Sequence, residues 1–191
     1  SLGLFPNAFV AGAQGAHLKV PNFERLNPAA DGSFLLTAWF NLRRLPASGE
    51  TIILLSKFEG APRPRNGYAL ALQRDQRSLR PLVFWGDQTT VGRWYDFPEI
   101  AVDQRQWFML ALSFSEKRYL GLYLGTKGIV ADGLPAPPQA LPTEDMQLLG
   151  GYELPPEALP ASSSPLVIGA FSDRPFRGLI GPVGLYNGNL D

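Results

Sequence analysis

Apolar residues recur at every second position along most apolar segments of this chain, and this period of two constrains the fold more than any other feature. In Ser33–Leu42, Phe34, Leu36 and Phe40 share one face, while Trp39 belongs to the other. The same alternation runs through Gly67–Arg74, Gln106–Phe114 and Tyr119–Leu124. Successive side chains of a β-strand point to opposite faces, so each segment is predicted to be a strand with one apolar face.

Glycine and proline separate these segments, with 20 Gly and 18 Pro in 191 residues. Both residue types penalise helix interiors, and Asn66-Gly67, Gly150-Gly151 and Asn187-Gly188 are predicted turns. Further predicted strands are Ala16–Val20, Thr51–Phe58, Leu79–Trp85, Pro165–Ala170 and Gly178–Asn187. Many short strands without interleaved helices predict an all-β fold, in which two antiparallel sheets pack face to face as a sandwich.

The chain length suits one domain over residues 1–191, with an N-terminal tail over 1–15 and a Pro-rich excursion over 134–165. Eight of the 18 prolines fall in this excursion, which is longer than the ~15 residues that ordinary loops rarely exceed. Two interpretations remain open. The excursion is either a semi-rigid surface connection or an arm that docks on a neighbour and buries residues such as Leu148 and Leu149.

The composition excludes several classes of function. The chain has no Cys and one His, which excludes a disulfide framework, a thiol nucleophile and a multi-His metal site. Its formal net charge of zero predicts no nucleic-acid partner. No apolar run approaches the roughly 18 residues that span a bilayer, so no membrane insertion is predicted, and the N-terminus lacks the basic region of a signal peptide.

Five segments together resemble a known family. The strand SFLLTAWFNL at Ser33–Leu42 resembles the "sfTisaWv" strand of concanavalin A-like domains of the laminin-G/pentraxin type. Similar blocks follow in the family's order at Thr51–Phe58 with Gly67–Gln73, at Gln106–Phe114, at Leu120–Gly125, and in PLVIGA followed by FRGLIGPVGLYNGNL. The resemblance implies a jelly-roll sandwich whose first and last strands pair. It also implies that Trp39 and Trp107 occupy structural positions.

Calcium is the one candidate cofactor, because many members of this family bind glycans or proteins with calcium. The resemblance implies an acidic ligand in the last strand, but the corresponding residues here are Ile180-Gly181-Pro182-Val183. The remaining candidate metal ligands are Asp31 and Asp173, which precede two of the family segments. Asp31-Gly32 fits equally well a turn capped by its own side chain.

Aromatic and charged residues are interleaved between positions 84 and 97, outside a clear core alternation. This composition is typical of a recognition surface, so the predicted ligand-binding residues are Trp85, Asp87, Arg93, Trp94 and Tyr95. The structural alternative is that Trp85 and Trp94 pair across a hairpin and close the sandwich edge. A second candidate patch consists of Tyr119 and Tyr123, which alternate away from the leucine face of their strand.

Catalytic patterns are missing from the sequence. It lacks the E-x-D-x-x-E strand of the glucanase branch, and His17, the only histidine, lies in a predicted edge strand. We therefore predict no catalytic residues and a non-enzymatic recognition module that binds glycan or glycoprotein. The competing prediction is an assembly protein, such as a virion capsid-decoration or tail component, whose partners are neighbouring subunits. A glycosidase is the third class. These functions favour an extracellular, cell-surface or virion setting.

Overall fold

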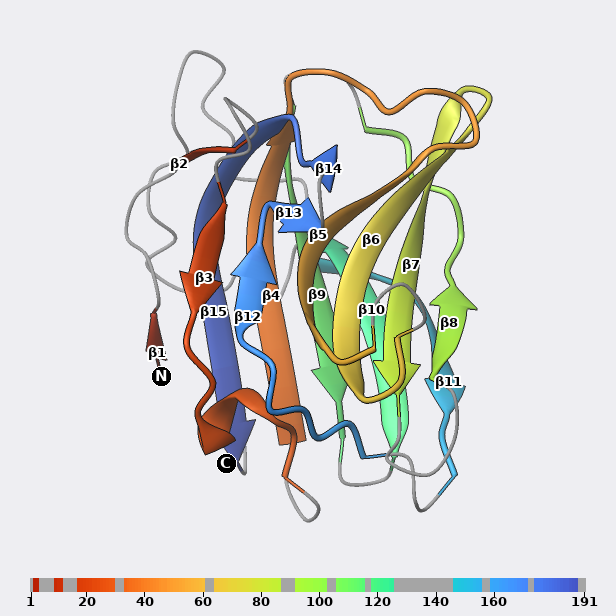
Figure 1. Ribbon diagram of the computed structural model, residues 1–191. Coiled ribbons are helices and arrows are strands. Elements are labelled where there is room, and N and C mark those ends of the chain that lie inside the picture. Colours follow the sequence, from red (N-terminus) through yellow and green to blue (C-terminus); the bar gives the residue numbers. More distant parts are fainter. Residues whose placement is uncertain are drawn as a thin grey trace.

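The chain folds into antiparallel strands with a single 3-10 turn, η1 (Glu24–Leu26), among the described residues (Figure 1). The computed structural model describes residues 2–3, 9–11, 17–29, 33–60, 64–86, 92–102, 106–115, 118–125, 146–155, 159–171 and 174–188.

The strands form two main sheets. Sheet A has the order β1-β15-β4-β9-β10-β11, and β2 also pairs with β15. Its strands are β1 (Leu2–Gly3), β2 (Phe9–Ala11), β4 (Ser33–Leu42), β9 (Trp107–Phe114), β10 (Tyr119–Gly125), β11 (Met146–Glu153) and β15 (Gly178–Gly188).

Sheet B has the order β3-β12-β5-β6-β7-β8. Its strands are β3 (Leu18–Val20), β5 (Thr51–Phe58), β6 (Gly67–Asp75), β7 (Ser78–Gly86), β8 (Arg93–Asp96) and β12 (Leu166–Ile168). A separate short hairpin joins β13 (Ala170–Phe171) to β14 (Arg174–Pro175).

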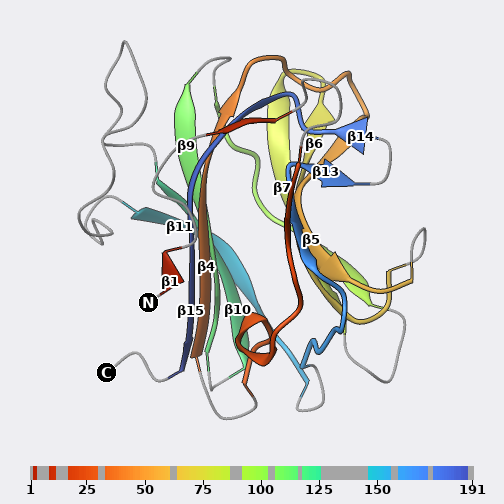
Figure 2. The same cartoon turned by 60° about the vertical axis from the view of Figure 1, so that its left-hand side comes forward.

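The two sheets lie face to face as two layers, and Figure 2 shows them from the side. Their facing sides bury one apolar core, to which Phe34, Leu70 and Leu112 contribute from different strands. The predicted all-β, two-sheet antiparallel sandwich is therefore confirmed, and its architecture is consistent with a jelly roll. Leu2 of β1 pairs with Leu185 of β15, so the first and last described strands are neighbours, as the resemblance implies.

The two-residue period of the apolar residues predicts the central strands well, since β4 and β5 begin and end at the expected residues. The Gly150-Gly151 pair, by contrast, lies within β11 rather than in a turn, because both glycines pair with β10. β11 thus places part of the predicted 134–165 excursion inside sheet A. The predicted tail over 1–15 likewise contains β1 and β2, which pair with β15.

Asn187 ends the predicted strand Gly178–Asn187 and begins the predicted Asn187-Gly188 turn. In the structure, both residues lie in β15, with Asn187 opposite Phe34 and Gly188 opposite Ser33. The Asn187 side chain instead ties the strand to the segment after η1. The amide nitrogen donates to the carbonyl oxygens of Arg25 (3.1 Å) and Asn27 (2.5 Å), and Oδ1 accepts from the Ala29 N–H (3.3 Å). The asparagine is therefore an anchor for η1 and not a turn residue.

We expect Asn187→Ala to lower the free energy of unfolding by about 2 kcal/mol, because three hydrogen bonds, two of them partly buried, lose their partner. Urea unfolding at neutral pH measures this loss. Asn187→Asp should cost at least as much, because its carboxylate would face two carbonyl oxygens. A variant as stable as the wild type would show that the anchor contributes nothing.

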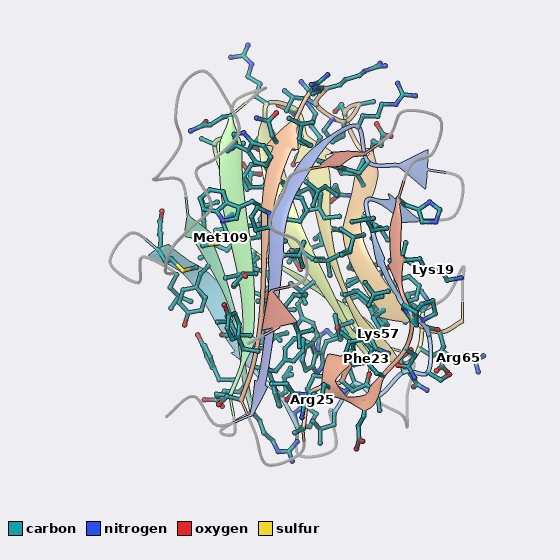
Figure 3. All side chains as sticks on the ribbon, turned by 90° about the vertical axis from the view of Figure 1, so that its left-hand side faces the viewer. Lys19, Phe23, Arg25, Lys57, Arg65 and Met109 are labelled. Carbon is teal, nitrogen blue, oxygen red and sulfur yellow. The ribbon has the colours of Figure 1, made fainter. Side chains whose placement is uncertain are left out.

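Lys57 closes the end of the sandwich near η1 from inside (Figure 3). Its side chain is fully buried and Nζ donates to Asn22 Oδ1 (2.7 Å) and to the carbonyl oxygens of Ser162 (2.5 Å) and Ser164 (2.8 Å). Burial lowers the pKa of Lys57 to about 8, against a smaller opposing effect of the Glu59 charge. One ammonium group thus holds β5, the segment after β3 and the segment before β12 together.

Tyr68 and Glu59 also form hydrogen bonds at the end of the sandwich near η1. The Tyr68 hydroxyl donates to the Leu26 carbonyl oxygen (2.8 Å), and burial raises the pKa of Tyr68 far above its ordinary value. Glu59 Oε1 accepts from the Ser163 N–H (2.7 Å) and hydroxyl (2.9 Å). These two bonds hold the pKa of Glu59 below its usual range. The described residues at the end of the 134–165 segment are therefore fixed to the sandwich.

Candidate functional site

The β7–β8 strand pair distributes the predicted ligand-binding residues over different faces. Trp85 lies opposite Arg93, and Trp94 lies opposite Phe84, so the two tryptophans do not pair across the hairpin. Successive side chains of β7 point to opposite faces of sheet B. Trp85 therefore points between the sheets, and Phe84 points to the outer face.

Trp85 belongs to the core, and its prediction as a ligand contact is corrected here. The residue is 2% exposed, and its ring centroid lies 5.1 Å from that of Phe114 and 6.4 Å from that of Tyr68. Phe34 packs edge-on at 6.5 Å. A side chain enclosed by three aromatic rings has no surface left for a ligand.

Trp94 lies on the outer face of β8, where 36% of the residue is exposed. Its ring centroid is 5.4 Å from that of Phe84, which lies 5.5 Å from that of Phe58. The buried Phe84 ring therefore supports the indole from beneath and fixes its orientation. Asp96, two residues further along β8, is exposed on the same face opposite Leu82. We call Trp94 and Asp96, with Phe84 beneath them, the β8 surface.

Arg93 and Tyr95 lie on the other side of β8, at the open edge between the two sheets. The Arg93 guanidinium carbon is 5.4 Å from the Tyr95 ring centroid, and Tyr95 packs on Tyr152 of β11 at 4.9 Å. The Tyr152 hydroxyl donates to the Asp96 carbonyl oxygen (2.5 Å), and its ring packs on Phe97. Since β8 and β11 are the last strands of their sheets, Tyr95 closes this edge while Arg93 remains exposed beside it.

Beside the β8 surface, Ser78 and Arg80 of β7 form a hydrogen-bonded group with Glu99, which follows β8. Glu99 accepts hydrogen bonds from the Ser78 hydroxyl (2.6 Å) and from Arg80 (3.2 Å), which also lies 3.6 Å from Asp75. The bond from Ser78, followed by that from Arg80, holds the pKa of Glu99 below its usual range. Glu99 is therefore a fixed negative charge at the border.

The remaining predicted site residues, Asp87 and the candidate metal ligands Asp31 and Asp173, lie outside the described residues. Within the described ranges, no group of three or more His, Asp or Glu side chains is arranged to hold a metal ion. In the same part of the chain, no helix has the length and apolar character needed to cross a membrane.

The second predicted patch, Tyr119 and Tyr123, lies on the outer face of sheet A, away from the β8 surface. The structure adds Tyr186 of β15 to this face. Tyr186 lies inside the predicted strand Gly178–Asn187, but the sequence prediction did not join it to Tyr119 and Tyr123, because the pairing of β15 with β4, and of β4 with β9, is not visible in the sequence. The signal that could have found it is the Gly184-x-Tyr186 spacing, which puts both residues on one face of a strand.

The sequence matches no protein-family profile and no curated protein. The fold is similar to solved binding domains of bacterial toxins. The binding domain of botulinum neurotoxin serotype D aligns with a TM-score of 0.62 and 14% identity over 97% of this chain and 40% of that chain. The binding domain of Paraclostridial Mosquitocidal Protein 1 gives 0.61 and 12% over 95% and 40%. The chain thus spans about two fifths of the length of these neighbours, and at such identities the likeness shows the fold.

Proposed function

We propose that this chain is a single concanavalin A-like domain that acts as a non-enzymatic recognition module and binds glycan or glycoprotein through the β8 surface. Two observations outside the site support this proposal. The segments that resemble concanavalin A-like domains form the two facing sheets, and the structural neighbours are described as binding domains.

The observation that carries the proposal is the exposed, supported indole of Trp94 beside a carboxylate. The apolar face of a sugar ring packs on an aromatic ring, while its hydroxyl groups bind planar polar side chains. Trp94 supplies the ring, held in place by Phe84, and Asp96 supplies the acceptor on the same strand face. Because the ring is already oriented, binding costs little side-chain entropy.

Glu99, at the border of the site, does not fit the role of general acid in glycoside hydrolysis. That role requires a carboxyl group kept protonated. The hydrogen bonds from Ser78 and Arg80 instead lower the pKa of Glu99 and so favour its ionised form.

Trp94→Ala is expected to weaken glycan binding at least ten-fold, because the stacking platform disappears while the Phe84 floor remains. A broad glycan array with wild-type protein, in calcium and in EDTA, identifies the ligand for calorimetric titration of both proteins. Trp94→Phe should retain part of the affinity.

Phe23→Ala is the matched control, since Phe23 is equally exposed at 37% but follows β3, at the opposite edge of sheet B. It should bind like the wild type. The proposal fails if the wild type binds no glycan with or without calcium, or if Phe23→Ala and Trp94→Ala lose affinity equally.

A further inference from the structure

Arg65 lies at one end of the β8 surface, in the hairpin that connects β5 to β6. Two backbone hydrogen bonds fix this hairpin. The Arg65 N–H donates to the Glu59 carbonyl oxygen (2.9 Å), and the Glu59 N–H donates to the Asn66 carbonyl oxygen (3.0 Å). Arg65 is exposed, and Figure 3 shows it on the outer side of sheet B. The fold therefore sets the position of this arginine and leaves its side chain to solvent.

Two glycines bring the backbone of Arg65 against the floor of the β8 surface. A β-carbon at Gly86 or at Gly92 would clash with the Arg65 carbonyl oxygen, so both residues lie directly against it. A β-carbon at Gly92 would also clash with the ring of Phe84, whose centroid lies 5.4 Å from that of Trp94. Gly92 and Trp94 are two residues apart, about 7 Å along an extended chain, which is within the reach of a long arginine side chain.

The positive charge of Arg65 is available to a ligand. Within the described part of the chain, no ion pair includes Arg65. Its hairpin, residues 59–66, contains one acidic residue, Glu59. The Glu59 carboxylate accepts hydrogen bonds from the N–H and the hydroxyl of Ser163 instead.

The opposite end of the β8 surface is negatively charged. Asp96 is exposed two residues beyond Trp94, and Glu99 follows at the border of the surface. The indole of Trp94 therefore lies between a cation at one end and carboxylates at the other. A polyanion that followed the whole strand would bring like charges against Asp96 and Glu99, which is unfavourable. One negative group, at the Arg65 end, meets no such repulsion.

From this order of groups we infer that the β8 surface selects glycans with a single terminal acidic sugar, whose carboxylate pairs with Arg65. The adjoining neutral sugar then lies on Trp94, and its hydroxyl groups donate to Asp96. An arginine–carboxylate pair is charge-assisted and bidentate, so Arg65 supplies orientation as well as affinity. The inference rests on the proposed glycan function and names the class of glycan that this surface takes.

Calorimetric titration with two matched pairs of probes tests this inference. 3′-Sialyllactose and aldotriouronic acid each carry one terminal carboxylate, and lactose and xylobiose are the same glycans without the acidic sugar. The wild type should bind at least one acidic probe about ten-fold more tightly than its neutral counterpart, because a charged bidentate pair is added. Higher ionic strength should narrow this difference, because salt screens exposed charges.

Substitutions of Arg65 assign the difference to this residue. Arg65→Gln should lower the affinity for the acidic probe to that for its neutral counterpart and leave the neutral affinity unchanged. Arg65→Lys keeps the charge without the planar fork and should retain part of the gain. Arg25→Gln is the matched control, because Arg25 is also exposed but lies in η1, which follows β3 at the opposite edge of sheet B. It should bind like the wild type, whereas Trp94→Ala should weaken binding of acidic and neutral probes alike.

The inference is overturned if the wild type binds none of the four probes, or binds the neutral probes as tightly as the acidic ones. It is equally overturned if Arg65→Gln binds the acidic probe like the wild type, or if Arg25→Gln loses as much affinity as Arg65→Gln. The glycan array separates these results from a failure of the proposed function. Binding of neutral glycans alone, lost in Trp94→Ala, would keep the proposed function and remove this inference, whereas binding of no glycan would remove both.

Discussion

Replacing Lys57 with methionine is expected to lower the free energy of unfolding by about 2 kcal/mol at pH 7. The substitution removes a buried positive charge, which is favourable, but it leaves Asn22 Oδ1 and the carbonyl oxygens of Ser162 and Ser164 without their donor. An unsatisfied buried acceptor costs about 1–3 kcal/mol, and three of them outweigh the roughly 3 kcal/mol recovered from the charge. Urea unfolding of both proteins gives the difference.

The pH dependence of this difference identifies its cause. The pKa of Lys57 is about 8 in the folded state, against 10.5 as the ordinary value. Between these values the unfolded chain binds more protons at this lysine than the folded protein, so stability rises with pH. Below pH 8 both states are protonated and the lysine contributes no slope. The stability of the wild type relative to Lys57→Met should therefore increase by about 2 kcal/mol between pH 7.5 and 9.5.

Lys19→Met is the matched control, because Lys19 is an exposed lysine on β3, which lies in the same sheet as β5 with β12 between them. Its stability should stay within about 0.5 kcal/mol of the wild type at every pH. Tyr68 is present in all three proteins, so its titration cancels in the comparison. A constant gap between wild type and Lys57→Met would mean that the folded lysine titrates at its ordinary pKa.

The alternation of the sequence predicts the sandwich because most strands have a single apolar face. In β4, for example, Phe34, Leu36 and Phe40 are buried between the sheets as their spacing implies. β11 was not predicted, because Gly150 and Gly151 are typical of turns. Only their pairing with β10 in the structure shows that they are strand residues. The role of Asn187 as an anchor for η1 could not be predicted, because its hydrogen-bond partners lie about 160 residues away in sequence.

The sequence predicts the candidate site only in part. It locates the aromatic segment, but it does not show on which face of its strand each aromatic residue lies. Positions 82 to 85 of β7 are apolar on both faces, since Phe84 packs in a separate cluster on the outer side with Ala69 and Ala71. A strand with two apolar faces has no alternation to show which side meets the core. The register of β7 against β8 therefore had to come from the structure, and it separates Trp85 from Trp94.

Trp85→Ala should accordingly cost about 4 kcal/mol of unfolding free energy, whereas Trp94→Ala should cost about 1 kcal/mol or less. Trp85 fills the space among Phe34, Tyr68 and Phe114, and alanine would leave a cavity there that the two sheets cannot close. Trp94 is supported on one side only and is already partly in contact with water. Urea unfolding of the two variants measures the contrast.

Trp85→Phe separates loss of volume from loss of the indole, because it keeps a ring in the same space and should recover more than half of the stability. Fluorescence quenching by acrylamide supplies an independent reading. Trp39, Trp85 and Trp107 are buried, so Trp94→Phe should remove most of the quenchable emission and Trp85→Phe should leave it unchanged. Equal destabilisation by Trp85→Ala and Trp94→Ala would contradict the assignment of one tryptophan to the core and the other to the binding surface.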